Sequence, residues 1–550
     1  MTKEFAATTP NTPLDVAIIG AGFAGMYMLH RLRRAGFAVR VVELGPDVGG
    51  TWYWNRYPGA RCDVESLQYS YSFDEGIQQD WTWTERFATQ PEILRYANFV
   101  ADRLDLRRDI QFGVRITSGR FDTTANQWVL ETDSGTAIHA RQVITAVGCL
   151  STANVPQIAG MESFEGQTIH TSDWPRDGVN LSGKRVAIIG TGSTAIQAIP
   201  EIARQAGHLT VFQRTPNFSV PARNAPLTPE TVDWWKKNYP DLRKKARETM
   251  RSGTIYDLPT RPAIGTDPAD VRAELEARWQ KGGANFAYAF SDLIFDETAN
   301  AMAAEFVRDK IRSIVHDPET AEALCPKDYP IFCKRICVDS DYFATFNRPN
   351  VSLVNLRQTP LERITSKGVQ TTDQEHEFDV IIYATGFDAI TGSLLRLNLT
   401  GTQGRTLKEK WADGPKAYLG LATSEFPNLF MITGPGSPSV LSNVLVSIEQ
   451  HVEFLSDLME HIRSHGITRI ETTAKDEEDW AHHVTEVAHT TLYPKAASWY
   501  MGANIPGKPR VFMPYIGVDA YRKKCAEVAA QGYVGFQMNG ADAVAHASAG

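Results

Sequence analysis

The chain has 550 residues, of which 43% are hydrophobic and 22% charged, and its formal net charge is -8. A chain of this length can bury a large core and is expected to form two or more domains. The negative balance, without a long basic run, disfavours a nucleic-acid or anionic-membrane partner, and no apolar stretch is long enough to span a bilayer.

The six cysteines show no CxxC pattern and no zinc spacing, so the sequence predicts no metal site. The nearest pair, Cys333 and Cys337, is expected to be reduced and packed in the interior. No apolar signal-peptide region precedes the first expected strand. We therefore expect a cytoplasmic protein, either a monomer or a weak homo-oligomer.

The first expected elements form a βαβ unit behind a polar tail of about 12 residues. Residues 15–19 are an apolar run typical of a buried parallel strand, residues 26–35 have helical periodicity, and residues 39–43 are the next strand. This order of elements is the one found in dinucleotide-binding folds.

A glycine-rich turn, Gly20-Ala-Gly22-Phe-Ala-Gly25, joins the first strand to the helix. Glycines there let the backbone approach a pyrophosphate at the helix N-terminus. Glu43 follows Gly25 by 18 residues, where an acidic residue binds ribose hydroxyls. The alternative is an ordinary βα turn, but the context favours a dinucleotide site, which we predict to hold FAD.

A run dense in aromatic residues and glycine spans residues 49–63 and includes Gly50, Thr51 and Trp52. It is compatible with a structural loop that packs aromatics on a sheet. It is equally compatible with a lining for a planar flavin, and the residues alone do not separate the two interpretations.

A second unit follows a strand-like piece at residues 142–147. Residues 184–189 and 209–213 are expected strands, and a helix through Ala206 lies between them. The turn reads Gly190-Thr-Gly192-Ser193-Thr194-Ala195. The second strand ends without a carboxylate, in Arg214-Thr215, and an arginine there suits the extra phosphate of NADP. The alternative is that Arg214 is a solvated charge at a strand end.

The rest of the chain changes texture twice. Residues 225–330 are rich in Ala, Glu, Arg, Lys and Trp and predict a helical insertion. Residues 379–388 return to the buried-strand pattern, and residues 447–464 predict a helix. The last dozen residues are small and weakly polar and predict a disordered end.

Between the two units stands the pattern Phe-x-Gly-x-x-x-His-x-x-x-Trp-Pro, filled by Phe164, Gly166, His170, Trp174 and Pro175. With this fingerprint, the two glycine turns and the later Ala384-Thr385-Gly386, the chain resembles the Baeyer–Villiger monooxygenases from about residue 14 to 535. It is most similar to the branch of phenylacetone and steroid monooxygenases, as in Tyr57-Pro-Gly-Ala-Arg-Cys-Asp63 and Gly434-Pro-Gly-Ser-Pro-Ser439.

This resemblance implies an α/β fold with two Rossmann-like dinucleotide-binding domains and a helical insertion. The implied limits are residues 1–150 and 389–550 for the FAD domain, 151–224 and 331–388 for the NADP domain, and 225–330 for the insertion. It also implies oxidation of a ketone to an ester or lactone by NADPH and O2, through a flavin C4a-peroxide, with sulfoxidation as a side activity.

The resemblance further implies roles for individual residues. Arg335 stabilises negative oxygen, as a permanently charged donor can, and Asp63 positions it. On the flavin side the implied contacts also include Gly50, Thr51, Trp52 and Tyr69. Lys334 joins Arg214 and Thr215 at the 2′-phosphate, and Trp499 closes over the nicotinamide. The family suggests a hinge or linker role for His170.

An aliphatic, uncharged pocket is implied by Val64, Leu150, Val440, Leu441 and Val444, although plain core packing would use the same residues. An uncharged ketone is therefore the expected substrate. Three alternative functions share features with this sequence: a flavin monooxygenase that oxidises nitrogen or sulfur, a disulfide reductase, and a non-catalytic flavoprotein. Arg335 with Asp63 argues against the first, and the missing cysteine pair argues against the second. The intact cofactor and fingerprint positions argue against the third.

Overall fold

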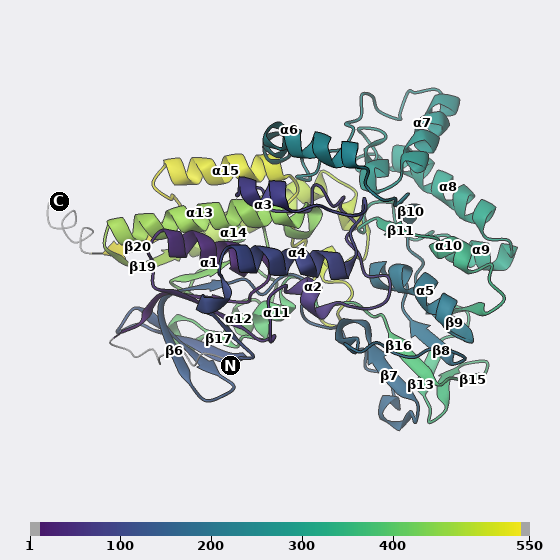
Figure 1. The fold of residues 1–550 in the computed structure, drawn as a ribbon, viewed down its shortest axis with the longest axis horizontal. Helices are drawn as coiled ribbons and strands as arrows, with labels where there is room; N and C mark the ends of the chain where they lie inside the picture. The colour runs from purple at the N-terminus through teal and green to yellow at the C-terminus, as the bar shows by residue number, and fades with distance from the viewer. Residues whose placement is uncertain (1–11, 541–550) are drawn as a thin grey trace.

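A computed structural model describes residues 12–540, and two separate sheets organise it (Figure 1). The eight-stranded sheet runs in the order β17-β4-β5-β6-β1-β2-β3, and β18 pairs with β6. Its strands are β1 (Leu14–Ile19), β2 (Val39–Glu43), β3 (Ile110–Phe112), β4 (Ile116–Asp122), β5 (Gln127–Thr132), β6 (Ala137–Thr145), β17 (Leu399–Thr400) and β18 (Leu429–Met431).

The centre of this sheet is parallel because β1 pairs with both β2 and β6 in that sense. Its first strand is apolar on both faces, and Val16, Ala17 and Ile18 are completely buried. Helix α1 (Phe23–Arg34) connects β1 to β2 and packs against α13 (Val444–Ser464). The first predicted βαβ unit is therefore present, with a helix that begins three residues earlier than expected.

The second sheet is wholly parallel and runs in the order β12-β9-β8-β16-β7. Its strands are β7 (Gln167–His170), β8 (Arg185–Ile189), β9 (His208–Gln213), β12 (Val351–Asn355) and β16 (Val380–Tyr383). Helix α5 (Ser193–Gln205) joins β8 to β9. The order reverses beside β8, so this sheet has the crevice at which doubly wound folds bind ligands.

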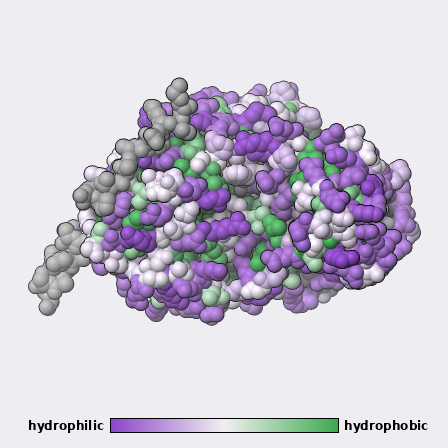
Figure 2. All heavy atoms as spheres, turned by 90° about the horizontal axis from the view of Figure 1, so that it is seen from below, coloured by the Kyte–Doolittle hydropathy of each residue, from purple (hydrophilic) through white to green (hydrophobic). Residues whose placement is uncertain are grey.

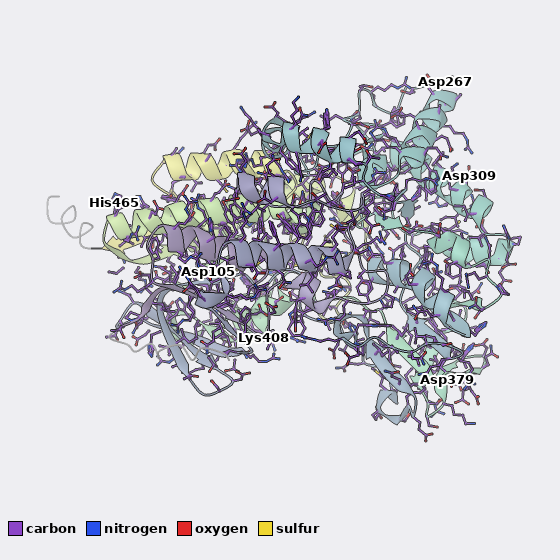
Figure 3. All side chains as sticks on the ribbon, viewed as in Figure 1. Asp105, Asp267, Asp309, Asp379, Lys408 and His465 are labelled. Atoms are coloured by element: carbon purple, nitrogen blue, oxygen red, sulfur yellow. The ribbon has the colours of Figure 1, made fainter. Side chains whose placement is uncertain are left out.

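The predicted insertion contains four α-helices between residues 229 and 324, joined by irregular connections: α6 (Pro229–Glu248), α7 (Pro268–Lys281), α8 (Glu297–Ile314) and α9 (Pro318–Leu324). Apolar residues of α7 and α8, among them Leu275 and Val307, belong to the same core as Val186 and Ile188 of the second sheet. Trp235 of α6 instead packs on the core of the first sheet. The insertion therefore touches both halves, and in Figure 3 Asp267 and Asp309 lie on it at the end opposite His465.

The remaining helices and strands complete the fold. The helices are α2 (Thr51–Trp54), α3 (Glu75–Asp80), α4 (Gln90–Arg103), α10 (Tyr342–Thr345), α11 (Gly392–Leu395), α12 (Leu407–Lys410), α14 (Ala474–His489) and α15 (Val518–Ala530). The strands are β10 (Ser219–Pro221), β11 (Cys337–Asp339), β13 (Leu361–Ile364), β14 (Gly368–Thr371), β15 (Glu375–Glu377), β19 (Ile467–Thr472) and β20 (Phe536–Gly540). On the face seen in Figure 2, hydrophobic residues reach the surface in patches between hydrophilic ones.

The predicted α/β class, with two Rossmann-like units and a helical insertion, is confirmed. Helices α4, α14 and α15 were not predicted. The two predicted tails lie outside the described residues, apart from residue 12 and from residues 539–540, which belong to β20. Within residues 12–540, no helix combines the length and apolar character of a membrane span.

Candidate active site

The first glycine turn joins β1 to α1 and has no space for side chains. A Cβ atom on Gly20, whose φ is +106°, would lie 2.6 Å from the carbonyl oxygen of Ala146, and one on Gly25 would lie 1.8 Å from the Gly20 oxygen. Gly22 precedes the helix without a side-chain cap. The first N–H groups of α1 therefore have no side chain over them, which suits an anionic ligand.

Glu43 ends β2 and lies against this turn. Its carboxylate accepts hydrogen bonds from the backbone N–H of Ala21 at 2.6 Å and of Gly45 at 2.7 Å. Burial raises the pKa of Glu43, and the two hydrogen bonds oppose that rise. The predicted ribose-binding residue is thus fixed beside the predicted pyrophosphate site.

The aromatic run packs on the same turn. A Cβ atom on Gly50, whose φ is +53°, would lie 2.8 Å from the Cα atom of Gly22, so this approach requires glycine at position 50. Thr51 and Trp52 begin the short helix α2, and the Trp52 indole N–H donates to the Tyr69 hydroxyl at 3.1 Å. The structure therefore brings all four predicted flavin-side residues of this region next to the first glycine turn.

The second glycine turn repeats this geometry between β8 and α5. A Cβ atom on Gly190, whose φ is +114°, would lie 2.4 Å from the carbonyl oxygen of Ala384, whereas Gly192 faces open space. Helix α5 also begins without a side-chain cap. Ser193 Oγ lies 3.4 Å from Cys337 Sγ, and Thr194 lies beside the Tyr57 hydroxyl.

Three cations gather beyond the end of β9. Arg214 is exposed, and its carbonyl oxygen accepts a hydrogen bond from Arg357 Nε at 2.8 Å. Lys334 Nζ lies 4.1 Å from the centre of the Tyr329 ring. Burial lowers the pKa of Lys334, and the charges of Arg214 and Arg357 lower it further. Asp328 pairs with Arg357 and partly offsets the lowered pKa of Lys334. The group still has a net positive charge, which suits a phosphate dianion.

Thr215 follows Arg214, and its carbonyl oxygen accepts a hydrogen bond from Thr191 Oγ1 at 2.8 Å. Thr191 belongs to the second glycine turn, so this bond ties the cation group to the turn. The residues predicted to bind the 2′-phosphate therefore lie together beside the second glycine turn. Arg357 lies with them, although it was not predicted. Arg357 could not be predicted, because it lies 143 positions from Arg214 and no sequence pattern joins the two residues.

Arg335 and Asp63 form a bidentate ion pair between segments far apart in the chain. Arg335 Nε donates to Asp63 Oδ2, and Nη2 donates to Oδ1 at 2.8 Å. Burial would raise the pKa of Asp63, but the adjacent guanidinium outweighs it and holds that pKa below its usual value. The same pairing overcomes burial and raises the pKa of Arg335. Both groups are thus ionised at neutral pH.

The guanidinium also contacts the predicted substrate pocket. Arg335 Nη1 donates to the carbonyl oxygen of Val440 at 2.7 Å. The Tyr500 phenol, whose pKa burial raises and Arg335 lowers, lies beside the guanidinium. Three of the five N–H donors of Arg335 are directed at Asp63 and Val440, so two remain for other acceptors. Tyr500 was not predicted, although it directly follows Trp499.

The predicted pocket residues all belong to the core of the first sheet. Val64 and Val440 are buried members of it, and the other three are half-buried and pack against it: Leu150, Leu441 and Val444. All five side chains are aliphatic and uncharged. An uncharged ligand group fits such a lining better than an ionic one.

The fingerprint residues lie before, in and after β7, at the edge of the second sheet, rather than at the ion pair. A Cβ atom on Gly166 would lie 2.4 Å from the Phe164 ring and 2.7 Å from a backbone oxygen, which explains the glycine. His170 contacts Ser172 Oγ at 2.7 Å and Thr385 Oγ1 at 3.2 Å. Burial lowers the pKa of His170. The histidine therefore joins the fingerprint to the segment Ala384-Thr385-Gly386.

Three predicted residues remain to be placed. Trp174 is buried, and Pro175 is exposed directly after it. Trp499 is half-buried, and its ring centre lies 4.5 Å from that of Tyr500. Through Tyr500, the predicted lid tryptophan is one residue away from a neighbour of the Arg335 guanidinium.

The residues present fit two dinucleotides. Each glycine turn leaves an uncapped helix N-terminus, one next to a carboxylate and the other next to three cations. All six cysteines are free and buried, and residues 12–540 contain no group of three or more side chains suited to hold a metal ion.

Comparison with known proteins gives a consistent set of relatives. The family model for pyridine nucleotide-disulphide oxidoreductases matches residues 14–236. An acetone monooxygenase (methyl acetate-forming) from Gordonia sp. (strain TY-5) is 42% identical over 96% of this chain and 99% of its own. A phenazine N-monooxygenase from Lysobacter antibioticus is 43% identical over 96% and 97%. A Baeyer-Villiger monooxygenase from Pseudooceanicola batsensis is 40% identical over 96% of both.

Solved structures agree with these relatives. An oxidised steroid monooxygenase bound to NADP superposes with a TM-score of 0.91 at 47% identity, over 96% of this chain and 99% of that one. A complex of OTEMO with FAD and NADP gives a TM-score of 0.92 at 38% identity, over the same shares.

Proposed function

Because this chain belongs to the Baeyer–Villiger monooxygenases, we propose that it uses FAD, NADPH and O2 to convert an uncharged ketone into an ester or lactone. The observation that supports this most directly is the Arg335–Asp63 ion pair, whose guanidinium also donates to the backbone of Val440, a buried member of the apolar core. Bound flavin supplies the activated oxygen, and bound nicotinamide supplies the electrons.

We assign four tasks to the chain's own residues. Arg335 places a fixed positive charge where negative oxygen develops, and its interaction is stronger when water is excluded. Asp63 keeps that guanidinium in one orientation through two hydrogen bonds. Arg214, Thr215 and Lys334 bind the 2′-phosphate, and Gly190 and its neighbours admit the pyrophosphate.

We also propose which residues contact the two cofactors. Gly20, Gly22, Gly25, Glu43, Gly50, Thr51, Trp52 and Tyr69 would hold FAD, and Ser193, Thr194 and Trp499 would contact NADPH. We retain the domain limits given above, because both sheets draw strands from two separate parts of the chain. His170 would act at the linker between the domains. The cytoplasmic location stays a prediction.

The test compares wild type with Arg335→Ala and with a control, Arg308→Ala. Arg308 is a partly buried arginine of α8 that donates to the carbonyl oxygen of Pro326. NADPH should reduce the flavin in all three proteins. Only Arg335→Ala should lose ester formation, by about 10²–10³-fold, as expected for removal of one oxyanion donor. Ester formation at a similar rate in Arg335→Ala would contradict the assigned role.

A second candidate function is oxidation of an aromatic nitrogen. The observation that favours it is the 43% identity to a phenazine N-monooxygenase. Assays of the wild type with a simple ketone and with phenazine, under the same conditions, separate the two. Sulfoxidation is a further side activity to test with a thioether.

A further inference from the structure

Helix α5 holds both partners of the ion pair from the NADP side. Arg335 lies two residues before Cys337, whose Sγ is 3.4 Å from Ser193 Oγ on the first turn of α5. Asp63 lies two residues after Arg61, which contacts the next turn of the same helix. One helix therefore bears on the segment that carries each charge.

The contact to Arg61 is made by the side chain of Gln197. Its Nε2 donates to the carbonyl oxygen of Arg61 at 3.1 Å, and its Oε1 accepts from the backbone N–H of Arg61 at 3.4 Å. The same Oε1 accepts from the Tyr57 hydroxyl at 2.9 Å. One carboxamide thus binds both backbone groups of one residue, as a neighbouring strand would.

The loop approaches α5 too closely for any residue but glycine at position 59. A Cβ atom on Gly59, whose φ is +79°, would lie 2.3 Å from the carbonyl oxygen of Gln197 and 3.1 Å from Glu201 Cγ. The contact is therefore built from both sides, by a glycine on the loop and by a glutamine on the helix.

We propose that Gln197 is a positioning residue: it fixes the loop that carries Asp63 to the helix that binds the nicotinamide dinucleotide, and so couples occupancy of that site to the orientation of Arg335. The inference rests on the proposed function for the consequence to catalysis. It does not rest on it for the contact itself. Since α5 begins at the predicted phosphate site, a ligand there steadies the helix and, through Gln197, the loop.

The first measurement is hydrogen–deuterium exchange in a peptide that covers residues 57–63, with and without NADP⁺. The variant is Gln197→Leu, which keeps the side-chain bulk and removes all three hydrogen bonds. The matched control is Gln205→Leu, an exposed glutamine of α5 whose Nε2 donates only to the carbonyl oxygen of Glu201 in its own helix.

NADP⁺ should slow exchange in this peptide in wild type and in the control. In Gln197→Leu the exchange should be about tenfold faster, as expected when a protecting hydrogen bond is lost, and NADP⁺ should no longer slow it. Unchanged exchange in Gln197→Leu would overturn the proposal. If Gln197→Leu does not fold, Tyr57→Phe removes one of the three bonds and should give a smaller change in the same direction. No change there would also overturn it.

The second measurement is the ratio of ester formed to NADPH consumed. Flavin reduction should stay within about twofold of wild type in Gln197→Leu, while the ratio should fall about fivefold, as expected for a misplaced catalytic group. In an Asp63→Asn background the same change should have little further effect. An equal loss in both backgrounds would contradict action through Asp63. Absence of ester from wild type would instead contradict the proposed function and leave the exchange result intact.

Discussion

Replacing Arg335 by methionine should destabilise the protein because it leaves the Asp63 carboxylate half-buried without its cation. The two side chains are 31% and 22% exposed, so the appropriate effective dielectric constant is about 20, which gives an attraction of about 4 kcal/mol at contact distance. Desolvation of both ions offsets part of this, and the net cost of losing one partner is about 2–4 kcal/mol.

Neutralising both partners should recover most of that loss. In the double variant Arg335→Met/Asp63→Asn no unpaired charge remains, and such replacements are often close to neutral. Ester formation should stay about 10²–10³-fold below wild type in both variants, because neither has the cation. Stability and activity should therefore separate in this pair of variants.

The assay measures the thermal unfolding midpoints of wild type and the two variants by scanning fluorimetry, in one buffer at neutral pH. We expect the single variant to unfold at the lowest temperature and the double variant close to wild type. A double variant no more stable than the single one would refute the claim that the instability comes from an unpaired Asp63.

Three further predictions concern the cation group, the buried Asp339 at the end of β11 and the second glycine turn. Burial lowers the pKa of Lys334, so this lysine loses its charge at a lower pH than an ordinary lysine does. The Kd for NADPH should therefore rise with pH on the alkaline side, and it should rise less in Lys334→Arg, measured by fluorescence titration. Burial raises the pKa of Asp339 from 3.8 to about 6, so stability should fall between these pH values and stay low above them. Asp339→Asn should therefore raise the free energy of unfolding at pH 7.5 by up to about 3 kcal/mol, and this gain should vanish below about pH 4. Gly190→Ala should weaken NADPH binding at least about tenfold without loss of FAD, measured by the same titration and by flavin absorbance, because its Cβ atom would meet the Ala384 carbonyl oxygen at 2.4 Å.

The sequence allowed the two βαβ units to be predicted because their signals are local. An apolar run, a glycine turn and a helical period lie within about 30 residues in each unit. The strand Val39–Glu43 was placed to the residue. Helices α4, α14 and α15 were missed, although they supply core residues such as Tyr96, Trp480 and Tyr521. Apolar residues recur along α4 and α14 with helical spacing, as they do along α1, but no glycine-rich turn precedes these helices.

The candidate site was predictable only with the family resemblance. Arg335 and Asp63 are separated by 272 positions, and no pattern within the chain joins them. Contacts that depend on the packing of distant segments were missed for the same reason: the Val440 carbonyl, the Tyr500 hydroxyl, Arg357 and Gln197. The exact fit of Gly59 against α5 was likewise invisible until the helix and the loop were placed together.

The most direct test of the central claim is oxygen-isotope transfer by the purified wild-type protein. The protein would be given FAD, NADPH, ¹⁸O₂ and a simple cyclic ketone, and the product would be analysed by mass spectrometry. We expect a lactone that contains one ¹⁸O atom per molecule, formed only when NADPH is present. Consumption of NADPH without lactone, or a lactone without ¹⁸O, would contradict the proposed oxidation of a ketone by O2.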